Sequence, residues 1–270
     1  MTSQYETKRL ITFDRIKIKS NYKYLLNTKV KFNEMFHSRS GEKIGIFYSS
    51  KDDINIPYNL YIAVSYIKQT LTLEFSSKIL KEKYPDLISR DTIKECLTNI
   101  NQLNICDIDV DSILSNGAIT SVDVTYDANL ILSDNLLDAL NSQVNNYRRF
   151  KWAHYDKEGI MFTKDVKSKD CTETITLYNK EKEICTSHNK DFLNSLSQPQ
   201  SVIDYFKEKT RFEITLDTPK KIMKYLNLTD TKIFSVLNSD TNPILAQFDK
   251  VFGNSTANMP QLLMITKIGQ

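Results

Sequence analysis

The sequence has few of the residues that build zinc sites, disulfide frames or histidine-rich metal centres. Its 270 residues include four cysteines and three histidines. The cysteines lie far apart with no Cys-x-x-Cys pair, and no two histidines are close in sequence. A structural zinc site and a disulfide frame are therefore disfavoured, and reduced intracellular thiols are expected.

Long apolar runs are missing as well. Nowhere do about 18 uninterrupted apolar residues occur, and the first residues, Met1 to Tyr5, lack the apolar stretch of a secretory leader. We therefore expect a cytoplasmic protein that has no membrane partner.

The excess of positive charge is small. Lysine and arginine total 36 against 33 acidic residues, and the net charge of +3 permits nucleic-acid binding without requiring it. Hydrophobic residues make up 40% and charged residues 26% of the chain, which is ordinary for a globular protein. Composition thus excludes a fibre or a disordered tail and leaves the function open.

Alternating hydrophobic and polar residues predict a β-rich first part. Strands are expected at 10–20, 43–49, 60–67, 69–75, 119–127, 149–154, 159–162, 172–180 and 210–216. Helices are expected behind Ser89 and Ser133 and from Thr218-Pro219 onward, because these residues are typical of helix starts. The order predicts an α+β fold, an antiparallel sheet with a polar catalytic face and helices packed on its other face.

Three of these strands place reactive side chains on one face. Because side chains alternate along a strand, Asp123 and Asp127 share a polar face, roughly 13 Å apart. By the same alternation the other two strands turn these residues outward: Tyr178 and Lys180, then Arg211 and Glu213. If the strands are neighbours, carboxylates, a phenol and cations converge.

Such a group of side chains suits phosphoryl transfer. Carboxylate oxygens bind Mg²⁺ or Mn²⁺, the ion polarises a phosphate, and a tyrosine oxygen attacks it. A free tyrosine has a pKa of about 10, so the metal-bound phosphate or a base such as Asp123 must help it lose its proton. The same residues also fit a solvated strand face, on which Arg211 simply pairs across the sheet. The residues alone therefore leave the function unresolved.

The local sequence of the three strands resembles a known family. The segments read Thr-Ser-Val-Asp-Val-Thr-Tyr-Asp at 120–127, Leu-Tyr-Asn-Lys-Glu-Lys-Glu at 177–183 and Arg-Phe-Glu-Ile-Thr-Leu at 211–216. Asp170 lies eight residues ahead of the tyrosine. In this order the segments resemble the rolling-circle replication initiators of small Gram-positive plasmids, the Rep_trans family, and more loosely the gene II replication proteins of filamentous phage.

The resemblance implies a site-specific nickase and strand transferase with an HUH-nuclease-like Rep fold. Tyr178 would attack a phosphodiester of an origin hairpin and stay joined to the 5′ end, while the released 3′-hydroxyl primes leading-strand synthesis. The implied partners are the hairpin, single-stranded DNA, a host helicase and DNA polymerase, and a second copy in a homodimer. The initiator domain is expected at 1–226, with a β-rich lead-in at 1–88 and the motif-bearing part at 118–226. A small C-terminal helical extension is expected at 227–270.

The family pattern also implies roles for the charged residues of these segments. Asp123 and Glu213 match acidic positions of the family and would bind Mg²⁺ or Mn²⁺. Asp127, at the rim of the site, and Asp170 would be accessory acids. The cations have phosphate as their target: Lys180 would neutralise it, and Arg211 would do the same or orient Glu213.

Contacts to DNA are expected in a segment that alternates cations with rings. Arg148, Arg149, Lys151 and Trp152 suit the neutralisation of phosphates and the stacking of bases. An ordinary amphipathic strand explains these residues equally well. Alternatively, the lysines of 220–224 would read duplex DNA.

Two other functions remain open. Ser121 stands where the family pattern has an arginine, and residues 162–167 replace its glycine-rich strand. Both departures are compatible with a non-catalytic DNA- or RNA-binding module of the same fold. A relaxase for conjugative transfer would use the same chemistry on another DNA partner.

Overall fold

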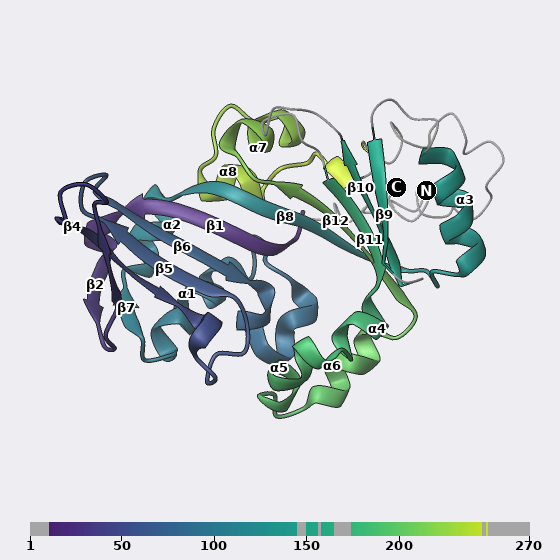
Figure 1. Ribbon diagram of the computed structural model, residues 1–270, viewed down its shortest axis with the longest axis horizontal. Coiled ribbons are helices and arrows are strands. Elements are labelled where there is room, and N and C mark those ends of the chain that lie inside the picture. Colours follow the sequence, from purple (N-terminus) through teal and green to yellow (C-terminus); the bar gives the residue numbers. More distant parts are fainter. Residues whose placement is uncertain (1–10, 145–149, 156–157, 165–173, 245–246, 248–270) are drawn as a thin grey trace, which may run out of the picture.

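The computed structural model describes residues 11–144, 150–155, 158–164, 174–244 and 247 (Figure 1). The strands are β1 (Phe13–Asn21), β2 (Leu25–Thr28), β3 (Asn33–Phe36), β4 (Lys43–Ser49), β5 (Leu60–Ser65), β6 (Thr70–Ser76), β7 (Cys106–Ile108), β8 (Ala118–Asn129), β9 (Phe150–Tyr155), β10 (Gly159–Lys164), β11 (Thr174–Asn179) and β12 (Lys209–Leu216). Ten of them form an antiparallel sheet in the order β3-β4-β5-β6-β1-β8-β12-β11-β10-β9, and β2 pairs with β7. The predicted antiparallel α+β fold is confirmed.

The helices form two groups and one separate helix. A first group packs into the main hydrophobic core: α1 (Ile93–Gln102), α2 (Val110–Asn116), α7 (Pro219–Leu226) and α8 (Ile233–Leu237). A second group gathers at the end of β11 and β12 (Figure 1): α4 (Lys180–Ile184), α5 (Lys190–Asn194) and α6 (Pro199–Phe206). The helix α3 (Asp134–Val144) lies beside β9 and β10, and its Leu136, Leu137 and Leu140 belong to the main core as well. Short 3₁₀ segments complete the described part: η1 (Tyr22–Tyr24), η2 (Ser50–Asp52), η3 (Ser77–Asp86) and η5 (Ser187–Asn189).

The helix starts follow the predicted capping residues in two of three cases. The hydroxyl of Thr218 accepts a hydrogen bond from the Lys221 N–H at 3.2 Å at the start of α7. Ser133 accepts one from the Leu136 N–H at 3.3 Å at the start of α3. The helix expected behind Ser89 begins at Ile93 instead, with Thr92 at its N-cap.

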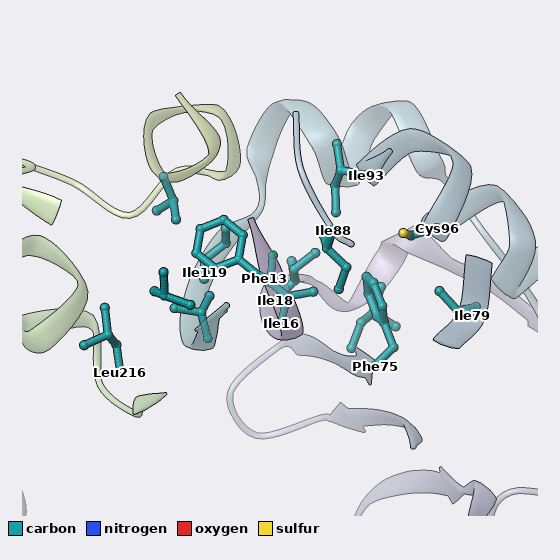
Figure 2. Packing of buried hydrophobic residues seen from close by; sticks show 14 of the residues in the cluster. Phe13, Ile16, Ile18, Phe75, Ile79, Ile88, Ile93, Cys96, Ile119 and Leu216 are labelled. Atoms are coloured by element: carbon teal, nitrogen blue, oxygen red, sulfur yellow. The ribbon is translucent and has the colours of Figure 1, made fainter. Parts of the chain in front are cut away.

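The main core lies between the sheet and the first group of helices. Figure 2 shows Phe13, Ile16 and Ile18 of β1 at its centre, near Ile119 of β8 and Ile93 of α1. All five are fully buried or nearly so. Burying each such side chain contributes about 1.5 to 3 kcal/mol, so this core fixes which face of the sheet is left for polar residues.

Part of the expected C-terminal extension packs into the same core. The Ile119 N–H donates to the carbonyl of Thr231 at 2.7 Å, and Ile233, Val236 and Leu237 are fully buried in the main cluster. The described residues beyond 226 thus contact β8 directly.

A β-bulge near the start of β1 turns two neighbouring polar residues to the same face. Phe13 lies opposite Val124 and Arg15 opposite Asp123, so Asp14 is the extra residue in β1. A bulge of this kind bends the strand and redirects a side chain. Asp14 therefore joins Arg15 on the polar face of the sheet.

Candidate active site

The three motif-bearing strands are neighbours in the order β8-β12-β11. Arg211 lies opposite Asp127 on one side and Tyr178 on the other, and Glu213 lies two residues further along β12. The side chains that were expected to converge therefore share one continuous face.

Tyr178 and Glu213 form the central contact of this face. The Tyr178 hydroxyl donates a hydrogen bond to Glu213 Oε1 at 2.9 Å. Burial and the charge of Glu213 raise the pKa of Tyr178 well above its usual value. Burial and the nearby Asp14 raise the pKa of Glu213 to about 7. A carboxyl group with a pKa near neutrality, at hydrogen-bonding distance from a phenol, is suited to accept its proton.

Asp123 is held by residues of β1 and β12. Arg15 donates to both oxygens of Asp123, from Nε at 2.7 Å and from Nη2 at 3.0 Å. The Thr215 hydroxyl donates to Asp123 Oδ1 at 2.8 Å, and Arg15 Nη1 also reaches Glu74 at 2.9 Å. The base that the geometry offers to the tyrosine is therefore Glu213, and not Asp123 as the sequence suggested.

Arg211 is the most enclosed charge of the site. Its side chain is 0% exposed, and its Nε and Nη2 donate to the two oxygens of Asp127 at 2.7 and 2.9 Å. Its Nη1 reaches the Tyr84 hydroxyl at 3.0 Å and Asp14 at 3.1 Å. Asp127 is 3% exposed, so it is a buried partner and does not lie at a rim. These contacts engage the guanidinium, so Arg211 pairs across the sheet, and its predicted contact to a phosphate stays a prediction.

Lys180 lies beside the tyrosine, as expected, but it is already partnered. It begins α4, is 2% exposed, and its Nζ donates to Glu183 Oε2 at 2.5 Å. The ammonium lies 5.2 to 5.5 Å from the centroids of three rings, those of Tyr84, Tyr178 and Phe206. The positive charge of Lys180 is thus close to the phenol of Tyr178 and forms an ion pair with Glu183.

Sequence reasoning missed the residues that the N-terminal half brings to the site. Asp14 accepts a hydrogen bond from the Ser77 hydroxyl at 2.5 Å. Burial would raise the pKa of Asp14, but Arg211 and Lys180 hold it below its usual value. Lys78 Nζ donates to Asn189 Oδ1 at 2.5 Å and lies 6.0 Å from the Tyr84 ring centroid.

Of these residues, Asp14 had a signal in the sequence. The apolar residues of the first strand are at 11, 13, 16 and 18, and the step of three between 13 and 16 is typical of a bulge. Lys78 and Tyr84 lie in η3, where no periodic pattern indicates a direction. Their contribution depends on contacts that are distant in sequence.

A second small hydrophobic cluster closes one end of the polar face. Its buried residues are Tyr84, Ile184, Phe192, Leu196, Val202 and Phe206, from η3 and the helices α4 to α6. Tyr84 and Phe192 pack edge to face with centroids 5.5 Å apart. The rings of Tyr84 and Phe206 in this cluster pack against Arg211 and Lys180.

Several predicted residues cannot be placed. Arg148, Arg149 and Asp170 lie outside the described residues, and for Lys151 and Trp152 only the backbone of β9 is described. Their predicted contacts to DNA or metal stay predictions.

Lys221 is one of the lysines that the alternative prediction assigned to duplex DNA. It is buried and pairs with Asp217 at 2.6 Å, so it does not belong to a surface that could read duplex DNA.

In the part of the chain that the structure describes, no helix is long and apolar enough to cross a membrane. Within the same part, no three His, Cys, Asp or Glu side chains group closely enough to hold a metal ion by themselves.

Comparison with known proteins identifies the family. The model of the Phage_CRI family, described as the N-terminal part of a replication-associated protein, matches residues 87–235, more than half of the chain. Among solved structures, a rolling circle replication initiator protein from Geobacillus stearothermophilus is similar, with a TM-score of 0.39 and 12% identity over 79% of this chain and 77% of that chain. No curated protein matches. The chain therefore belongs to the Phage_CRI family of replication-associated proteins, which confirms the resemblance to replication initiators expected from its three strand motifs.

Proposed function

We propose that the protein initiates rolling-circle replication by nicking one DNA strand with Tyr178. The phenolic oxygen attacks a phosphodiester in an origin hairpin, the bond to the 3′ oxygen breaks, and the 5′ phosphate stays on the tyrosine. The leaving 3′ oxygen takes up a proton and becomes a primer end. The family supports a role in replication, and the observation that carries the nucleophile is the 2.9 Å hydrogen bond from Tyr178 to Glu213.

Glu213 is the general base of this proposal. Its pKa of about 7 leaves a substantial fraction of the carboxylate ionised at neutral pH and able to accept the phenolic proton. The raised pKa of Tyr178 makes this help necessary, because an unassisted buried phenol stays protonated. The neighbouring ammonium of Lys180 favours the phenolate that forms.

Mg²⁺ or Mn²⁺ belongs to the proposal, with Asp123 and Glu213 as its predicted ligands; Oε1 of Glu213 accepts the hydrogen bond from Tyr178, which leaves Oε2 for the ion. Burial is the main cause of the raised pKa of Glu213, the charge of Asp14 comes next, and the charge of Asp123 acts in the same direction. Mg²⁺ is commonly held by one or two carboxylates together with water and substrate phosphate. Both oxygens of Asp123 accept hydrogen bonds from Arg15, so an ion that binds together with DNA would replace one of these contacts, and it would polarise the scissile phosphate.

The partners follow from the chemistry. A free 3′-hydroxyl requires a DNA polymerase, and strand displacement requires a helicase, so host enzymes of these kinds are the proposed partners, in the cytoplasm. A homodimer is the predicted assembly, and sedimentation at several protein concentrations distinguishes it from a monomer.

The experiment is a nicking assay on supercoiled DNA that carries the origin, with Mn²⁺ present. Wild-type protein should give nicked circles with protein covalently attached, and Tyr178→Phe should give neither. Tyr66→Phe is the matched control, because Tyr66 is an exposed tyrosine in the turn between β5 and β6. Nicking by Tyr178→Phe at the wild-type rate would exclude Tyr178 as the nucleophile. Salt-sensitive hairpin binding without an adduct in any divalent ion would favour the non-catalytic module instead.

A further inference from the structure

The polar face of the sheet continues from the candidate site across the N-terminal strands. Lys19 of β1 lies opposite Thr72 of β6, Thr72 opposite Ala63 of β5, and Ala63 opposite Phe47 of β4. In the adjacent row of the same face, Tyr61 of β5 lies opposite Glu74 of β6, and Glu74 lies opposite Lys17 of β1. Figure 1 shows these strands at the opposite end of the sheet from β9, β10 and β11.

This part of the face is open and carries two aromatic rings. Burial alternates strictly along β6, so its other face is the one that is packed in the core. Phe47 and Tyr61 are partly exposed and belong to neither hydrophobic cluster. Their ring centroids are 6.1 Å apart with an interplanar angle of 33°. Two adjacent rings outside the core offer a surface on which flat groups stack.

Two positions beside Phe47 on this face carry little or no side chain. Ala63 separates Phe47 from Thr72, and at Gly45 a Cβ atom would come 2.5 Å from Met35 Cε. Met35 therefore covers the position where any larger residue would project.

Three cations of β1 lie on this face between the rings and the candidate site. Arg15, Lys17 and Lys19 follow each other on this face of β1, and Glu74 pairs with the first two at 2.9 Å. Lys19 is exposed and, within the described residues, forms no ion pair. It is thus available to a phosphate that lies between the rings and the candidate site.

We propose that Lys19, Phe47 and Tyr61, here called the platform, bind the single-stranded DNA that flanks the segment cut at Tyr178. This inference rests on the proposed function for the identity of the nucleic acid. Tyr61 is five strand spacings and about six residues from Tyr178, roughly 30 Å. Single-stranded DNA on one binding domain covers about 4 to 16 nucleotides, so one segment reaches both. Bases stack on the two rings and Lys19 neutralises a phosphate.

The test separates binding from cleavage. Fluorescence anisotropy with labelled (dT)20 is measured on the Tyr178→Phe protein, in which no covalent step takes place. Phe47→Leu and Tyr61→Leu keep an apolar cover on the sheet and remove the ring, and each should weaken binding about fivefold or more. Lys19→Ala should reduce the slope of log affinity against log salt by about 0.7, the value for one phosphate contact to a single strand.

Matched controls lie on other surfaces. Phe234→Leu changes an exposed ring of α8, and Lys94→Ala removes an exposed charge of α1. Both should bind (dT)20 like the parent protein. Photocrosslinking with 5-iodouracil in the oligonucleotide should label peptides that contain Phe47 or Tyr61.

The outcomes distinguish the platform from the nuclease. Platform variants that bind as tightly as the controls overturn the platform, whatever the nicking assay shows. Loss of binding in these variants supports it, even if wild-type protein forms no adduct and the proposed function fails. Variants that abolish self-association but leave DNA affinity unchanged show that a second copy of the chain covers this face, which also overturns the proposal.

Discussion

The buried ion pair between Arg211 and Asp127 allows a quantitative test of how the site is built. Both side chains are almost fully buried, and two hydrogen bonds of 2.7 and 2.9 Å join them. Removing one partner leaves the other charge buried and uncompensated, which costs about 3 to 5 kcal/mol. We therefore expect Asp127→Ala and Arg211→Met each to lower the free energy of unfolding by about this amount.

The double variant isolates the pair from the effects of each substitution. Because either single change already breaks the pair, the double variant should cost less than the sum of the two, with a coupling energy of about 1 to 3 kcal/mol. It should not be neutral, since Arg211 also contacts Tyr84 and Asp14. Urea denaturation followed by circular dichroism measures all three proteins. Lys68→Ala, at an exposed turn, should stay within about 0.5 kcal/mol of wild type.

Two results would refute this reasoning. One is an Arg211→Met protein that unfolds within about 1 kcal/mol of wild type, and the other is a double variant whose cost equals the sum of the single costs. Either would mean that Arg211 is not committed to Asp127. Its guanidinium would then be free to contact a DNA phosphate, as the sequence alone suggested.

Three further predictions concern the same face. In the folded protein the pKa of Glu213 is raised from 4.5 to about 7, so the free energy of unfolding should fall by about 2 to 3 kcal/mol as the pH rises from 5 to 8. Urea unfolding of Glu213→Gln at the two pH values should lack this pH-dependent component. Gly159→Val puts a Cβ 2.5 Å from the Leu177 carbonyl oxygen and 2.7 Å from Tyr178 Cβ, so it should both lower the unfolding midpoint and reduce adduct formation in the nicking assay. EDTA should abolish nicking while (dT)20 anisotropy stays unchanged, and nicking that survives exhaustive chelation would exclude the metal.

The shared face of β8, β11 and β12 was predictable because strand alternation is a local property. Alternation assigned Tyr178, Glu213 and Asp123 to the polar faces of their strands, and the sheet order β8-β12-β11 meets the condition that these strands are neighbours. The register then follows from the core, since a slip by one residue would expose Phe212 to water.

What surrounds these residues was not predictable in the same way. Alternation tells which face a side chain occupies, but it does not tell what covers that face. Asp127 was expected at a rim, yet η3 and α6 bring Tyr84 and Phe206 over that end of the sheet. The pairing of Arg15 with Asp123 depends on β1 and β8, which are more than a hundred residues apart in sequence. Such contacts arise from packing of the whole chain.

The most direct test of the central claim is to map the covalent link by mass spectrometry. The adduct formed with origin DNA and Mn²⁺ is digested with nuclease and protease, and the modified peptide is sequenced. The account predicts a nucleotide joined through its 5′ phosphate to Tyr178, the tyrosine whose hydroxyl is bonded to Glu213. A nucleotide on any other tyrosine, such as Tyr84 or Tyr155, or on a serine, would contradict it.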